Sequence, residues 1–244
     1  FYTGGAVHWM FNHSKKNKKK SIFAKLTRNS ETLSSNSFEI AQYANVDLVI
    51  VPGMCIAKEF VDNNGKTFLD LAKRKIPVLY VGAGALEYTD EEAAYYVKFL
   101  NKFHKYGIIT RDSDTFNTLH NQGVKSLEKG IDCALFLPDR YTPPTLSLSK
   151  FNIENFDSGQ DIPNIDHKDA LVLRTHHDCW GPLREVYTKE KNTLVSDVPF
   201  DYLALYANVN ETYSDRVHAC LATLAYGNKA RLFSKTPRAS LFKE

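Results

Sequence analysis

The segment Ser214-Asp215-Arg216-Val217-His218 places a guanidinium group and an imidazole two residues apart. The residues that follow predict a helix beginning near residue 217, with apolar positions at helical spacing and a final glycine: Val217, Leu221, Leu224 and Gly227. The start of a helix presents unpaired amides and the positive end of its dipole, so Arg216 and His218 could bind an anion there. From these residues alone, an equally good interpretation is that Asp215 caps the helix and Arg216 pairs with a nearby acid.

A second arginine stands at a similar corner in the first half of the chain. In Ile109-Thr110-Arg111-Asp112-Ser113, an apolar strand that we expect to be buried ends at Arg111, and Asp112 or Ser113 can cap the next helix. We expect Arg111 to point into a cleft. Taken alone, an arginine in this position is more typical of a structural tie between loops.

These corners need a scaffold of alternating strands and helices. Short β-branched apolar runs predict strands at 46–51, 76–81, 106–110 and 133–137. Helices are expected from Thr89, which with Glu92 forms a capping box, and over about 114–122, where Gly123 is a left-handed stop. Strands that are apolar on both faces favour a parallel, doubly wound sheet over a sandwich.

A second unit with the same rhythm follows a polar stretch. Residues 138–166 are rich in Pro, Ser, Asn, Asp and Gly, and we take 151–166 as the linker between a first lobe, 1–150, and a second lobe, 167–244. In the second lobe, strands are expected at 170–174, 193–196 and 230–233, and helices near 200–207 and 217–226. The fold class is therefore α/β, with two Rossmann-like lobes facing a central cleft, as in GT-B proteins.

Composition limits the partners and the compartment. A net charge of +3 over 244 residues predicts no nucleic-acid partner, and no apolar run is long enough to span a bilayer. We expect a soluble protein in the cytoplasm or at the membrane surface. A secretory compartment stays open because the chain begins at Phe1 and its N-terminus looks incomplete.

Two further motifs suggest cofactors at first sight. Gly82-Ala83-Gly84 follows a strand, but Tyr88 stands where a dinucleotide fingerprint needs its third glycine, so no nicotinamide cofactor is expected. His176-His177-Asp178-Cys179-Trp180 resembles a metal cluster, yet adjacent side chains on an extended backbone point to opposite faces. We predict a loop lining the cleft rather than a metal site.

The two corners, taken in order, resemble those of the polysaccharide pyruvyl transferases. The resemblance runs from about residue 46 to 233 and rests on two blocks: Arg111-Asp112-Ser113 with Leu119, Gly123 and Asp132-Cys133-Ala134, and Asp215-Arg216-Val217-His218-Ala219 with Gly227. Val217 replaces the leucine usual in the family, and the family's early Gly-Asp loop is not visible in residues 1–10.

The resemblance implies an enzyme that transfers a pyruvate ketal (carboxyethylidene) group from phosphoenolpyruvate to a sugar of a polysaccharide or glycan precursor, including lipid-linked ones. It implies that Arg111, Arg216, Val217 and His218 hold the donor. His218 would be an acid catalyst or a clamp on the phosphate. No cofactor is expected beyond the donor substrate.

Two other functions remain open at this point. A nucleotide-sugar-dependent GT-B glycosyltransferase would share the architecture and could use Arg216 at a helix start for its diphosphate. A catalytically degenerate, glycan-binding member would keep the fold and lose turnover.

Overall fold

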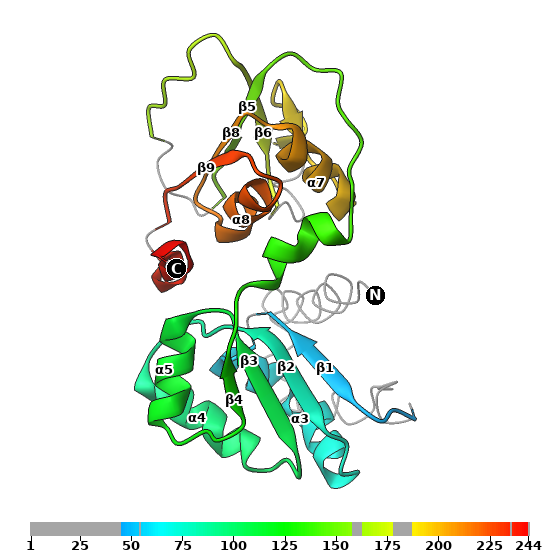
Figure 1. Cartoon of the computed structure of the whole chain (residues 1–244), viewed down its shortest axis with the longest axis vertical. Coiled ribbons are helices and arrows are strands. Elements are labelled where there is room, and N and C mark those ends of the chain that lie inside the picture. The colour runs from blue at the N-terminus through cyan, green and yellow to red at the C-terminus, as the bar shows by residue number, and fades with distance from the viewer. Residues whose placement is uncertain (1–44, 54, 158–162, 178–186, 235, 244) are drawn as a thin grey trace, which may run out of the picture.

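The computed structural model describes residues 45–53, 55–157, 163–177, 187–234 and 236–243, which form two α/β lobes (Figure 1). The first lobe contains a parallel sheet in the order β1-β2-β3-β4. Its strands are β1 (Val49–Pro52), β2 (Val78–Ala83), β3 (Tyr106–Thr110) and β4 (Leu127–Lys129). The helices that connect them are α3 (Lys58–Lys73), α4 (Asp90–Leu100) and α5 (Ser113–Asn121).

The core of the first lobe lies between this sheet and its helices. Tyr80 and Ile108, from the middle strands, are buried against Tyr96 of α4 and Leu119 of α5. Burial of a large apolar side chain contributes about 1.5–3 kcal/mol, so the core fixes the carboxyl ends of β2 and β3, where Arg111 follows.

The second lobe contains a five-stranded parallel sheet in the order β7-β6-β5-β8-β9. Its strands are β5 (Phe151–Asn155), β6 (Leu171–Thr175), β7 (Thr193–Leu194), β8 (Glu211–Ser214) and β9 (Lys229–Leu232), and its helices are α7 (Pro199–Asn208) and α8 (Val217–Ala225). In this order the connections change direction between β5 and β8. Such a switch point places ligands at the carboxyl ends of the two strands, where Asp157 and Arg216 lie.

The two faces of β5 differ in chemistry. Phe151 and Ile153 pack with Tyr206 of α7 and with α8, which forms the apolar core of the second lobe. On the opposite face, His167 bonds through its two ring nitrogens to Glu154 (2.8 Å) and Asn152 (3.3 Å). A strand with one apolar and one hydrogen-bonded polar face is stable because each buried polar group has a partner.

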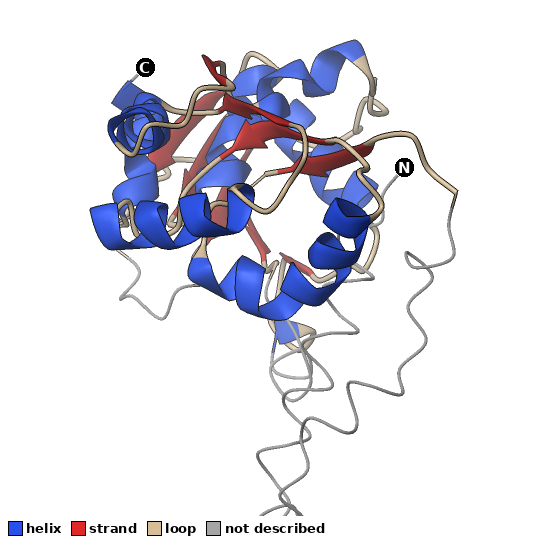
Figure 2. Ribbon diagram, turned by 90° about the horizontal axis from the view of Figure 1, so that it is seen from below, coloured by secondary structure: helices blue, strands red, loops and turns tan. Residues whose placement is uncertain are grey.

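Two short 3-10 helices lie between the lobes. The first, η3 (Cys133–Asp139), carries the chain out of the first lobe and packs against α8. The second, η4 (Pro237–Lys243), ends the chain and lies between the two lobes in Figure 1. In the view from below, helices lie around the outside of the strands (Figure 2). No helix in the described ranges is long and apolar enough to cross a membrane.

Most predicted elements are confirmed within a few residues. Thr89 caps α4 by accepting a hydrogen bond from the Glu92 amide (3.1 Å), and Gly123 and Gly227 have the positive φ values, 78° and 81°, expected after α5 and α8. The other bond of the capping box, from the Thr89 amide to the Glu92 carboxylate, was predicted wrongly, because that carboxylate accepts from the amides of residues 86–88. Helix α3 and strands β4, β5 and β8 were not predicted.

Two predictions of secondary structure need correction. The expected strand at 133–137 is the 3-10 helix η3, because Asp132 caps it by accepting from Ala134 N (2.9 Å) and Pro138 cannot donate to a sheet. The expected linker at 151–166 begins with β5, the middle strand of the second sheet. The polar residues on one face of β5 made its sequence resemble that of a linker.

Candidate functional site

Arg111 lies at the carboxyl end of β3, in the space between the lobes. Its amide donates to Ala83 O (2.9 Å) and the next residue, Asp112, caps α5 by accepting from Thr115 N (2.6 Å). The guanidinium group is only 1% exposed. An added Cβ at Gly84 would overlap it, so that glycine leaves room for the arginine and not directly for a substrate.

Among the described residues, the contacts of the Arg111 guanidinium group leave two of its nitrogens without a hydrogen bond. Nη1 lies 3.5 Å from Asp132 Oδ2 and 3.5 Å from His218 Nε2, and Nε lies 3.7 Å from Asp112 Oδ2. Within the described residues, buried Nε and Nη2 make no hydrogen bond. A buried guanidinium with unpaired donors is costly, so this group is well suited to an anion.

His218 lies opposite Arg111, in the first turn of α8. Its side chain is 51% exposed, and Nε2 lies 3.3 Å from Asp132 Oδ2. The preceding Val217 is buried beside it. Arg111 and His218 therefore meet across the two lobes, 107 residues apart in the chain.

Asp132 is the carboxylate shared by this pair. Burial raises its pKa, but hydrogen bonds from His218 and from the Ala134 amide, together with the charges of His218 and Arg111, outweigh burial and lower the pKa below its ordinary value. Asp132 is therefore ionised at neutral pH.

Arg216 occupies the N-cap position of α8 rather than its first turn, and its side chain turns toward an acid. The amide donates to Ser214 Oγ (2.8 Å), and Nε lies 3.4 Å from Asp157 Oδ2. Asp215 Oδ1 accepts from the Asp157 amide (3.1 Å). The pairing of Arg216 with an acid was one of the two interpretations left open by the sequence.

Asp157 is the centre of a second buried cluster. It accepts hydrogen bonds from His176 Nδ1 (2.8 Å) and the His177 amide (2.9 Å), besides the contact with Arg216. Burial raises its pKa, but these hydrogen bonds and the charges of Arg216 and His176 lower it to about 2. Asp157 thus anchors the side chain of Arg216 at the switch point of the second sheet.

The two histidines after β6 serve different partners, as expected for an extended backbone. His176 binds Asp157 and stacks on Tyr187, with ring centroids 3.6 Å apart, while His177 Nε2 lies 2.6 Å from the Tyr206 hydroxyl. Burial lowers the pKa of His177 to about 4, against the opposing charge of Asp157. Across the residues with assigned structure, no group of three His, Cys, Asp or Glu could hold a metal ion. Residues 178–180 of the motif lie outside the described ranges.

A loop near Arg111 was missed by the sequence reasoning. Glu92 Oε2 accepts from three successive amides, those of Leu86 (3.2 Å), Glu87 (2.9 Å) and Tyr88 (3.1 Å). This holds Tyr88 at a φ of 58°, and its hydroxyl donates to Asp112 Oδ2 (3.2 Å). Burial and the charge of Asp112 raise the pKa of Tyr88 to about 12, so the hydroxyl stays a donor.

A third arginine, Arg238 of η4, was also missed. Burial, the charge of Arg111 and the charge of Arg216 lower its pKa, whereas Tyr88 raises it. These interactions place Arg238 within electrostatic range of both predicted arginines. The only sequence signal was a cation in the last ten residues, which no periodicity distinguishes from a surface arginine.

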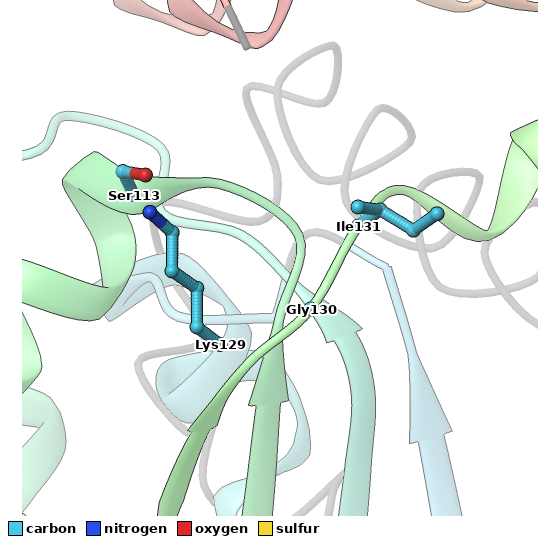
Figure 3. A pocket seen from close by; sticks show the side chains of 4 residues that line it. All are labelled: Ser113, Lys129, Gly130 and Ile131. Carbon is cyan, nitrogen blue, oxygen red and sulfur yellow. The ribbon is translucent and has the colours of Figure 1, made fainter.

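A pocket of about 540 Å³ adjoins the Arg111 corner (Figure 3). It is lined by Ser113, Lys129, Gly130 and Ile131, with the Lys129 side chain extending toward Ser113 and Ile131 pointing away. Ser113 is two residues from Arg111 and Gly130 two residues from Asp132. The pocket offers a surface on which part of a substrate can lie beside these groups.

Comparison with known proteins identifies the sequence pattern. Residues 6–234 match the family described as polysaccharide pyruvyl transferase, which is nearly the whole chain. Among curated proteins, no sequence matches.

Solved structures show a similar fold at low identity. The chain is similar to UDP-GlcNAc 2-epimerase of Methanocaldococcus jannaschii in complex with UDP-GlcNAc and UDP, with TM-score 0.52, 13% identity, and coverage of 84% of this chain and 65% of that one. S. aureus MnaA with UDP gives TM-score 0.57 and 14% identity over 82% of this chain and 60% of that one. The Rickettsia bellii UDP-N-acetylglucosamine 2-epimerase gives TM-score 0.52 and 16% identity over 87% of this chain and 64% of that one.

These neighbours are epimerases with the GT-B type of fold, and the predicted fold class is confirmed. At such identities they indicate the fold alone. The chain spans less than two thirds of the length of each of the three.

Proposed function

The chain belongs to the polysaccharide pyruvyl transferase family, and from this premise we propose that it transfers a carboxyethylidene group from phosphoenolpyruvate to two hydroxyls of one sugar in a polysaccharide or glycan precursor. The observation that carries the proposal is the meeting of Arg111 and His218 across the lobes, with unpaired donors on a buried guanidinium group. The donor carries a carboxylate and a phosphate a few atoms apart, and this cluster can offset both charges.

The reaction needs two additions at one carbon. A sugar hydroxyl attacks C2 of the enol, and a proton is delivered to C3, which becomes the methyl group. A second hydroxyl then attacks C2 and the C2–O bond to phosphate breaks, which closes the ketal and releases inorganic phosphate. The proton lost by each hydroxyl balances the proton gained at C3 or by the leaving phosphate.

The residues where the two lobes meet have distinct roles in this proposal. Arg111 binds the donor through Nε and Nη2, which make no hydrogen bond among the described residues, and Arg216, held by Asp157, supplies a second positive charge from the other lobe. The backbone at Val217, in the first turn of α8, presents helix amides to the anion. His218 can transfer a proton because its ring is half exposed.

The direct test measures phosphate release from phosphoenolpyruvate with a polysaccharide acceptor. We expect Arg216→Ala and His218→Ala each to lower turnover by about a hundredfold or more while the protein stays folded, because each removes a group that meets developing charge. Arg231→Ala is the matched control, since that arginine is 66% exposed and pairs with Glu211. Near-normal turnover of the Arg216→Ala, His218→Ala double variant would exclude these roles.

A thermal-shift experiment separates this proposal from a nucleotide-sugar enzyme. Phosphoenolpyruvate should raise the melting temperature, and UDP- or GDP-sugars should not, because a ligand stabilises only the state that binds it. Stabilisation by nucleotide sugars alone would favour the other donor class. Stabilisation by phosphoenolpyruvate without any phosphate release would identify a binding protein that has lost turnover.

A further inference from the structure

Asp132 lies where the two lobes meet, and the proposed contacts between the protein and phosphoenolpyruvate give it no role. It ends the first lobe after β4 and caps η3, the helix that packs against α8 of the second lobe. Its carboxylate reaches both Arg111 Nη1 (3.5 Å) and His218 Nε2 (3.3 Å), and its side chain is only 8% exposed.

The protons at this junction can be assigned from the partners. A guanidinium group can only donate, and a carboxylate can only accept. His218 Nε2 lies 3.5 Å from the Arg111 donor and 3.3 Å from the Asp132 acceptor. Both contacts of Asp132 are satisfied together when Nε2 carries a proton and donates it, while Arg111 Nη1 also turns to the carboxylate. The alternative, a bare Nε2 that accepts from Arg111, would set its lone pair against a carboxylate oxygen.

We propose that Asp132 is a positioning residue that fixes the proton on Nε2 of His218 by accepting it, so that the other ring nitrogen, Nδ1, is the one that delivers a proton in the donor site. This inference rests on the proposed function, in which His218 transfers a proton, and it goes beyond it by choosing the acid role over a simple phosphate clamp. A clamp through Nε2 would need the N–H that Asp132 already accepts.

The same carboxylate has a cost for donor binding. Asp132 is an anion at the guanidinium edge that a carboxylate or phosphate of the donor would approach. It therefore repels the donor while it prepares the acid. Its removal should strengthen donor binding and slow turnover, a combination that the loss of a merely structural residue would not produce.

Asp132→Ser is the sharpest variant. Serine is a good N-cap residue, so it can still accept from the Ala134 amide and keep η3 in place. It is uncharged and too short to reach His218. Asp139→Ser, at the exposed far end of the same helix, is the matched control for the same chemical change.

Three readouts test the proposal. In Asp132→Ser, the dissociation constant of phosphoenolpyruvate, measured by calorimetry, should fall by about threefold or more because a nearby like charge is gone. Turnover in the phosphate-release assay should fall by about tenfold or more because the acid is no longer prepared. Imidazole ¹⁵N shifts, measured without any substrate, should show Nε2 protonated in the wild type and a different proton distribution in the variant.

The outcomes separate the two levels of inference. Weaker donor binding with unchanged turnover, or identical ¹⁵N shifts in both proteins, would overturn the role of Asp132. Absence of phosphate release from the wild-type protein would instead refute the proposed function, and the ¹⁵N comparison would still decide whether Asp132 fixes the His218 proton. Asp139→Ser should match the wild type in all three measurements.

Discussion

Replacing Gly84 by alanine should displace the Arg111 guanidinium group without replacing any charged residue. The added Cβ would lie 2.6 Å from Cζ and 2.7 Å from Nη2 of Arg111, where ordinary contacts are about 3.5 Å or more, so the group must move by about 1 Å. A misplacement of this size costs about a hundredfold in rate, or about 2.7 kcal/mol of transition-state stabilisation. Overpacking at a buried site adds a loss of stability of about 1–3 kcal/mol.

The assay is phosphate release over a range of phosphoenolpyruvate concentrations, with thermal melting measured in parallel. Gly65→Ala in α3 is the control, because its added Cβ would meet Val61 and Phe99 at ordinary distances of 3.6 and 3.9 Å. We expect Gly65→Ala to behave as the wild type. If Gly84→Ala folds and keeps its donor affinity and turnover, then the position of Arg111 does not matter to the donor and the reasoning is refuted.

Two further predictions concern the second cluster and the third arginine. Because the pKa of Asp157 is lowered in the folded state, Asp157 stabilises the protein above the unfolded pKa of about 3.9, and this stabilisation is lost as the pH falls toward 2. Between pH 5 and pH 2 the wild type should therefore lose about 2 kcal/mol of unfolding free energy that Asp157→Asn does not lose, as measured by denaturant titration at both pH values. The same acid dependence in both proteins would contradict the cluster. Arg238→Gln should weaken phosphoenolpyruvate binding severalfold at low salt and less at high salt, since it removes a charge near Arg111 and Arg216; equal affinities in calorimetry would remove Arg238 from the site.

The elements that could be predicted from the sequence are those that bury apolar side chains or end at a glycine. Strands β2, β3 and β6 were found because their residues are hydrophobic, and the ends of α5 and α8 because only glycine readily adopts their positive φ. Strand β5, Phe151-Asn152-Ile153-Glu154-Asn155, was missed although all five residues are buried, since its polar members bond to partners distant in sequence. Hydrophobicity cannot reveal a strand stabilised in this way.

In the candidate site, too, local features could be predicted from the sequence and contacts between distant residues could not. Helix and strand ends could be placed from local signals, which located Arg111, Arg216 and His218 at the edges of their lobes. The partners of these residues could not, because Asp132 meets His218 over 86 residues of chain and Asp157 meets Arg216 over 59. The first contact depends on how the two lobes pack and the second on the pairing of β5 with β8, and no short motif encodes either.

The order of strands also bears on how the two lobes form during synthesis. In the described part of the first sheet each strand pairs with the next one along the chain, so β1 to β4 can assemble as soon as Lys129 is available. In the second sheet β5 can pair with β6, the next strand along the chain, but its other edge must wait for β8, since Asn152 pairs with Glu211. Pairings distant in sequence form slowly, and domains near the N-terminus fold first. Arg111 would therefore be in place on the first sheet before the ribosome has made His218, and the candidate site would be completed only when the second sheet closes.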